Sequence, residues 1–175
     1  LAEKNTSRIG RKDEKAFADK NLSYRKAIKS VYFRYDNWMD SLRTVWKKDG
    51  KLIEQNNPKW YGGDGGNSDG DKHFTLGDDE EIVSMSVRSD VLVDAVMFQT
   101  NKGRRIPETG QFGSKGADKI KWKKLQAPRI RGFCGNSAKS IDSIGLRYLV
   151  LSDRAQSRSF LLSIEPYLWD RYPKK

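Results

Sequence analysis

The chain has 175 residues and a formal net charge of +11 at pH 7, from 34 Lys and Arg against 23 Asp and Glu. This length suits one domain that can bury a core of its own. The single cysteine, Cys134, excludes an internal disulfide, the single histidine, His73, excludes a histidine-cluster metal site, and apolar runs of only four or five residues exclude a membrane-spanning helix.

Three segments are predicted in chain order. Residues 1–16 are expected to form an N-terminal arm, residues 17–152 the domain, and residues 153–175 a C-terminal extension whose apolar and aromatic side chains pack on the domain or on a neighbour. The chain opens at Leu1 rather than Met, which indicates a processed product or an excerpt of a larger protein. We expect it to be secreted or extracellular, with a cytoplasmic location as the alternative.

One pattern recurs three times, beginning at Ile28, Ile82 and Ile130. In each copy the residue three positions on is apolar, and an aspartate follows twelve positions after the isoleucine. Each aspartate has an apolar residue before it, a small residue after it, and then another apolar residue. The matching residues are Val31, Met85, Phe133; Met39, Val93, Ile141; Asp40, Asp94, Asp142; Ser41, Ala95, Ser143; and Leu42, Val96, Ile144. Repetition at offsets of 54 and 48 residues predicts pseudo-threefold architecture with one loop aspartate per unit.

The units are predicted to be built from short strands. Val83, Met85 and Val87 alternate with serines, and residues 144–150 form another series of period two. Glycine and asparagine turn signals recur at short intervals, whereas helical periodicity is weak. The fold class is therefore all-β, as a sandwich, a barrel or a prism.

Basic residues are concentrated in residues 102–131, which hold ten Lys or Arg against two acids. We expect this stretch to lie on the third unit, with Lys119, Lys121 and Lys123 alternating along one strand and facing one side. Such a surface attracts polyanions, although a merely solvated face would have the same composition. The candidate polyanion-binding residues are Lys115, Lys119, Lys121, Lys123 and Lys124.

Over residues 12–152 the chain resembles the jacalin-related lectins, including mannose-binding, griffithsin-like and zymogen-granule-like members. The resemblance is carried by ordered motifs at family spacing, in residues 62–66, 82–94, 98–105, 112–116 and 132–145. It implies a β-prism I fold, in which three four-stranded Greek-key sheets surround a pseudo-threefold axis. The three repeats point to the same symmetry independently.

The resemblance also implies where sugar binds, because in this family an aspartate loop and a glycine-rich loop meet at one end of a sheet. The carboxylate accepts hydrogen bonds from sugar hydroxyls, and glycines let backbone N–H groups approach the sugar closely. An aromatic side chain two residues before the aspartate can lie against the sugar ring. The principal site implied here consists of Asn37, Trp38, Met39 and Asp40 with Gly62, Gly63, Asp64, Gly65 and Gly66.

Two secondary carbohydrate sites are implied in the other units. The second joins Leu92, Val93 and Asp94 to Gly113 and Ser114, but it lacks the aromatic residue and has fewer glycines. The third joins Lys139, Ser140 and Asp142 to the segment after Gly10. There Ala138 stands where the family usually has glycine, and the charged residues 11–15 replace a glycine loop. Lys139 and the basic arm could instead suit a sulfated or phosphorylated ligand.

We therefore expect a carbohydrate-binding module for mannose- or glucose-type glycans that is not an enzyme and needs no metal or cofactor. The loop aspartates lie in different repeats, so they are not paired catalytic carboxylates, and no P-loop or dinucleotide fingerprint is present. Expected partners are glycans or glycoproteins, heparin-like polyanions, and either a second copy of the chain or further domains of a larger protein. The alternatives are a module that binds sulfated glycosaminoglycan, acidic lipid or nucleic acid, and a structural domain inside a larger protein.

Overall fold

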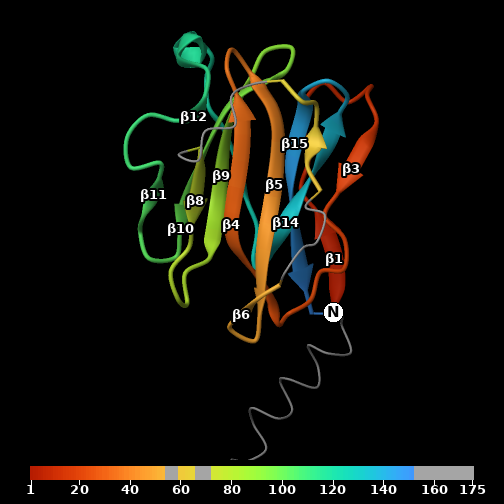
Figure 1. Ribbon diagram of the computed structural model, residues 1–175, viewed down its shortest axis with the longest axis vertical. Coiled ribbons are helices and arrows are strands. Elements are labelled where there is room, and N and C mark those ends of the chain that lie inside the picture. Colours follow the sequence, from red (N-terminus) through yellow and green to blue (C-terminus); the bar gives the residue numbers. More distant parts are fainter. Residues whose placement is uncertain (54–58, 66–71, 152–175) are drawn as a thin grey trace, which may run out of the picture.

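A computed structural model describes residues 1–53, 59–65 and 72–151, and their strands form three antiparallel sheets (Figure 1). Each sheet is centred on a long hairpin: β4 (Lys26–Tyr35) with β5 (Met39–Lys48), β9 (Ile82–Ser89) with β10 (Val93–Thr100), and β14 (Ile130–Ser137) with β15 (Ile141–Val150). The hairpins coincide with the three sequence repeats. The expected all-β architecture of three sheets is confirmed, while the proposed C-terminal extension lies outside the described residues.

The outer strands follow one scheme in all three sheets. Two short strands share the free edge of the second hairpin strand, and a third short strand pairs with the first. In the first sheet these are β6 (Lys51–Leu52), β7 (Tyr61–Gly62) and β8 (His73–Thr75); in the second, β11 (Arg105–Ile106), β12 (Phe112–Gly113) and β13 (Lys123–Gln126); in the third, β1 (Ala2–Asn5), β2 (Ile9–Gly10) and β3 (Ala16–Ala18). Each sheet thus fills four strand positions.

The N-terminal segment, expected to be an arm, supplies an edge of the third sheet. In β1, Ala2 pairs with Val150, and in β2, Gly10 pairs with Ser143, so both strands lie against β15. Without them the backbone groups along that edge of β15 would be unpaired. The two ends of the domain are therefore joined through one sheet.

The repeated apolar columns form the core between the sheets. Ile28, Ile82 and Ile130 are at most 4% exposed, and every other apolar residue of the repeat is at most 1% exposed. The small residues after the aspartates, Ser41, Ala95 and Ser143 in the three repeats, are fully buried as well. The spacing of apolar residues that the three repeats share therefore marks the inward face of each hairpin.

Asp19 connects the first sheet with the third. Its carboxylate accepts hydrogen bonds from the Thr44 hydroxyl at 3.1 Å, on β5, and from the Phe133 backbone N–H at 2.8 Å, on β14. The residue is 1% exposed, and this burial raises the pKa of Asp19 to about 6 despite both hydrogen bonds. A single buried side chain thus fixes two neighbouring sheets.

Candidate functional site

The loops that join the long hairpin strands, residues 36–38, 90–92 and 138–140, lie at one end of the molecule, at the top of Figure 1. Next to each loop the aspartate carbonyl accepts a backbone hydrogen bond from the edge segment that packs against it. The N–H donors are those of Gly63 to Asp40 at 3.1 Å, Ser114 to Asp94 at 2.9 Å, and Arg11 to Asp142 at 2.9 Å. The same loop-to-loop contact is therefore made three times.

A glycine precedes each donor because no other residue fits there. Gly62, Gly113 and Gly10 have φ of +103°, +124° and +119°, a region that favours glycine. A Cβ on any of them would also stand 2.1–2.2 Å from the aspartate carbonyl oxygen. These three glycines bring an aspartate loop against its partner segment in every unit.

In the first unit this contact leaves Asp40 on an open hollow of about 460 Å³. Gly65 lies so close to the carboxylate that an added Cβ would be 2.8 Å from Oδ1. Burial raises the pKa of Asp40, and hydrogen bonds from the Trp38 and Ser140 side chains oppose that shift. The hollow, called the Asp40 hollow below, is lined by Trp38, Asp40, Gly63, Asp64, Gly65, Ala138, Lys139 and Ser140.

The structure therefore brings together residues that were predicted to belong to two different sites. Lys139 and Ser140 were assigned to the third site, yet they border the Asp40 hollow. The reason is the packing of adjacent units: an added Cβ on Gly63 would stand 2.2 Å from the Lys139 carbonyl oxygen, so the two backbones are in contact. The absence of a side chain at Gly63 was the only sequence signal for this approach.

Other residues of the implied principal site lie elsewhere. Met39 is fully buried in the core and so presents no side chain to the hollow. Asn37 lines a separate hollow of about 350 Å³ together with Gly113 and Ser114 of the second unit. Gly62 allows the close backbone approach to Asp40 described above, and Gly66 lies outside the described residues.

The carboxylate of the second aspartate is hydrogen-bonded within its own loop. The Asp90 backbone N–H donates to Asp94 Oδ2 at 3.0 Å, and burial raises the pKa of Asp94 despite this bond. Val93 belongs to the core, and Leu92 is half-buried. Ser114 caps a 3-10 helix, Lys115–Lys119, by accepting a hydrogen bond from the Gly116 N–H at 3.1 Å. A helical turn thus stands where the first unit has its glycine loop.

In the third unit a cation of the chain itself approaches the aspartate. Arg11 Nη2 lies 3.5 Å from Asp142 Oδ1, and the same guanidinium pairs with Asp13 at 2.8 Å and Glu14 at 3.2 Å. Asp142 is 3% exposed, and burial raises its pKa while Arg11 opposes the shift. The carboxylate that would face a ligand is therefore covered by Arg11.

The basic stretch differs from the prediction in two ways. Lys119 ends the 3-10 helix, and β13 begins only at Lys123, so Lys119, Lys121 and Lys123 do not alternate along one strand. In addition, β13 pairs with β9, which places Lys123 and Lys124 on the second sheet rather than the third. The local cause is the turn closed by the Ile120 N–H on the Ala117 carbonyl at 2.9 Å. Lys119, Lys121, Lys123 and Lys124 are all exposed.

The described residues contain no group of three or more His, Cys, Asp or Glu side chains that could hold a metal ion. Within the same ranges, no helix is long and apolar enough to cross a membrane.

Comparison with known proteins places this geometry in a family. A search of curated proteins found no significant sequence match. Among solved structures, the Malaysian banana lectin is similar at 22% identity and a TM-score of 0.63, covering 85% of this chain and 99% of the lectin. A mannose-binding lectin from champedak gives 18% identity and 0.64, with 86% and 99% covered. A mannose-binding jacalin-related lectin from Ananas comosus gives 19% and 0.62, with 84% and 97% covered.

These structural likenesses agree with the three-sheet β-prism fold. The family model for the jacalin-like lectin domain matches residues 7–147, which is most of the chain and includes all three aspartate loops. Proteins of this family bind carbohydrates and are not enzymes. The chain belongs to the jacalin-like lectin family.

Proposed function

We propose that the chain binds mannose- or glucose-type glycans in the Asp40 hollow. The observation that carries the proposal is the state of the Asp40 carboxylate. It borders an open hollow beside Gly63 and Gly65, and it forms no ion pair with any described residue. A carboxylate in this position can accept hydrogen bonds from two neighbouring hydroxyls of a sugar.

The rest of the hollow suits a neutral sugar. The backbone N–H groups of Asp64 and Gly65 have no hydrogen-bond partner among the described residues, so they can donate to sugar oxygens. Trp38 is 41% exposed at the rim, where its apolar ring can lie against the sugar. The champedak and Ananas comosus lectins, which share the fold, are mannose-binding, and this supports the choice of sugar class.

Titration calorimetry with mannotriose tests the proposal. Asp40→Ala should abolish measurable binding, because each charged hydrogen bond contributes about 1.5–3 kcal/mol. Gly65→Ala should weaken binding about tenfold or more, since its Cβ would meet the carboxylate at 2.8 Å. Binding of the Asp40→Ala protein with the affinity of the parent would refute the site.

The matched control is Gly116→Ala, at the position in the second unit that corresponds to Gly65. There the added Cβ would stand 3.4 Å from the Ser114 hydroxyl with no other atom within 4 Å, and Gly116 does not line the Asp40 hollow. Its affinity should equal that of the parent. Acid provides a further check: because burial raises the pKa of Asp40, binding should weaken with falling pH earlier than an ordinary aspartate would require.

A second candidate function is polyanion binding by the exposed basic stretch on the second sheet. It is favoured by one observation: Lys119, Lys121, Lys123 and Lys124 form no ion pair with a described residue. Such binding should weaken steeply as salt rises, whereas neutral sugar binding should hardly respond. Elution of Lys121→Glu/Lys123→Glu from heparin at the same salt as the parent would exclude this role.

A further inference from the structure

A larger hollow, of about 570 Å³, adjoins the Asp40 hollow. Ala138 lines both, while Gly62 lines the larger one and Gly63 the Asp40 hollow. The two therefore lie on either side of one short backbone segment. A volume of this size is typical of ligand-binding pockets. We call it the lysine hollow, after Lys15, Lys20 and Lys59, which border it.

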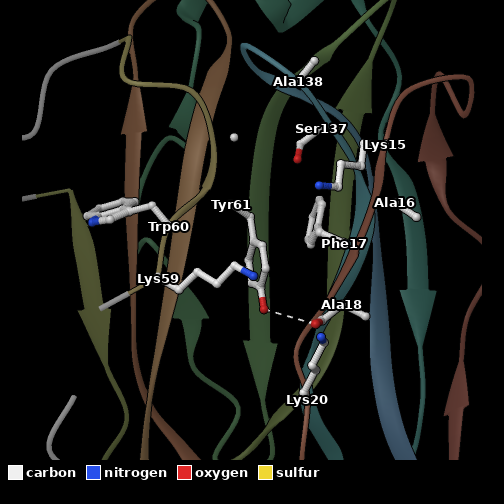
Figure 2. A pocket seen from close by; sticks show the side chains of 11 residues that line it. Lys15, Ala16, Phe17, Ala18, Lys20, Lys59, Trp60, Tyr61, Ser137 and Ala138 are labelled. Atoms are coloured by element: carbon white, nitrogen blue, oxygen red, sulfur yellow. Dashed lines mark hydrogen bonds between the residues drawn. The ribbon is translucent and has the colours of Figure 1, made fainter. Parts of the chain in front are cut away.

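The floor of the lysine hollow is a pair of aromatic rings from two different sheets. Phe17 of β3 and Tyr61 of β7 are stacked, with ring centroids 4.7 Å apart and planes 19° apart. The Tyr61 hydroxyl donates to the Ala18 carbonyl at 3.1 Å, which fixes the ring (Figure 2). Phe17 is buried, whereas Tyr61 is only half-buried. An apolar ring face is thus held rigidly at the floor.

This aromatic floor is a departure from the repeat. Phe112 precedes Gly113 in the second unit as Tyr61 precedes Gly62 in the first, yet Phe112 is buried and stacks on Phe33 at 4.6 Å. The core therefore absorbs the ring in the second unit, while in the first unit the ring stays accessible. The accessibility of the Tyr61 ring is therefore not a consequence of how the core packs.

Three cations surround the floor, as Figure 2 shows. Lys15, Lys20 and Lys59 are exposed, and none forms an ion pair with a described residue. The Lys59 ammonium lies 5.6 Å from the centroid of the Tyr61 ring. No acidic side chain of the described residues lines the hollow. Unpaired ammonium groups beside a flat apolar surface suit a ligand that has a ring and a negative charge.

We propose that the lysine hollow is a subsite for an anionic sugar unit of the same glycan whose neutral unit occupies the Asp40 hollow. The inference rests on the proposed function at Asp40. An anionic unit is favoured because three lysines and no carboxylate line the hollow. A connected glycan is favoured because the hollows share Ala138. The charge can be a carboxylate or a sulfate ester, since either pairs with ammonium groups.

The test compares three probes by titration calorimetry: mannotriose, mannotriose extended by a terminal glucuronic acid, and mannotriose with a sulfate on its terminal unit. At least one acidic probe should bind the parent about tenfold more tightly than mannotriose, as expected from one charged hydrogen bond. Lys15→Gln/Lys59→Gln should lose this advantage and keep the affinity for mannotriose. The control Lys121→Gln/Lys123→Gln removes the same charge from the second sheet and should keep the advantage.

Each outcome separates the subsite from the principal site. Equal binding of all probes by the parent, or an acidic advantage that survives in Lys15→Gln/Lys59→Gln, would overturn the subsite even if mannotriose binds. An advantage lost equally in the control would also overturn it, because net charge would then be the cause. If mannotriose does not bind but acidic probes bind through Lys15 and Lys59, the proposed function at Asp40 fails while the anionic site stands.

Discussion

The loop regions around Asp40 and Asp142 have the same backbone arrangement, but their carboxylates have different surroundings. In both, a glycine with positive φ brings a backbone N–H onto the aspartate carbonyl, at 3.1 Å for Asp40 and 2.9 Å for Asp142. At Asp40 the next residues are Gly63, Asp64 and Gly65, and the carboxylate borders a hollow. At Asp142 the next residue is Arg11, whose guanidinium lies 3.5 Å from the carboxylate.

The repeat therefore preserves a backbone scaffold, and a few side chains decide whether a ligand can bind in each unit. The apolar columns and the close glycine contact are needed to close each unit, so all three units have them. The residues that follow the glycine contribute little to the core and can vary. Residues 63–65 therefore leave the Asp40 carboxylate accessible, whereas Arg11 covers the carboxylate of Asp142.

The largest effect is expected at the glycine with positive φ that both regions have. Gly62→Ala and Gly10→Ala should each cost about 3 kcal/mol or more, because the new Cβ would overlap an aspartate carbonyl in a backbone region that disfavours side chains. Urea denaturation gives the free energy of unfolding. The two variants should lose similar amounts, since the two contacts have the same geometry.

Gly110→Ala is the matched control for that measurement. Gly110 also has positive φ, at +74°, but an added Cβ would meet nothing within 4 Å. It should cost only about 1 kcal/mol. Similar losses for Gly110→Ala and Gly62→Ala would mean that backbone conformation matters and the contact with Asp40 does not.

The sequence predicted most of this scaffold. The three repeats identified the inward faces of the long hairpins, because burial constrains apolar spacing within each strand. The resemblance paired each aspartate loop with the edge segment that follows it, and the third with the segment after Gly10. The hydrogen bonds from Gly63, Ser114 and Arg11 follow that pairing.

Contacts between units could not be predicted in this way. Lys139 and Ser140 border the Asp40 hollow because neighbouring sheets pack together, and no periodicity within one repeat encodes that distance. Lys119 and Lys121 looked like strand residues by alternation, but a capped 3-10 turn takes up this stretch and delays β13 until Lys123. Both misassignments arise where local pattern competes with tertiary contact or turn chemistry.

The second prediction concerns Asp19, which holds the first and third sheets, and hence both aspartate regions, in a fixed relation. Its pKa is about 6 in the folded protein against 3.8 as the ordinary value, so the folded state binds the extra proton between about pH 4 and pH 6. The free energy of unfolding should therefore fall as pH rises through this window, by on the order of 3 kcal/mol from this group. Asp19→Asn should remove that part of the pH dependence.

The measurement is urea denaturation at several pH values between 4 and 7, with the difference between parent and Asp19→Asn plotted against pH. Asp78→Asn is the control, because Asp78 is fully exposed. This variant accounts for the loss of one carboxylate charge. A difference for Asp19→Asn that varies with pH no more than the difference for Asp78→Asn would show that burial does not shift the titration of Asp19.

The smallest effect is expected where the comparison is most direct, at Arg11. Arg11→Ala removes the cation from Asp142, and because Arg11 is 44% exposed the free energy of unfolding should change by less than about 1 kcal/mol.

Calorimetry with mannotriose should give a stoichiometry near one for both the parent and Arg11→Ala. Removing Arg11 supplies neither a glycine loop nor an aromatic residue, since the residue two before Asp142 is Ser140, which is buried and bonded to Asp40. The double variant Asp40→Ala/Arg11→Ala should not bind, and any binding it retains must come from another unit. A stoichiometry near two for Arg11→Ala would mean that the guanidinium is the whole difference between the two regions.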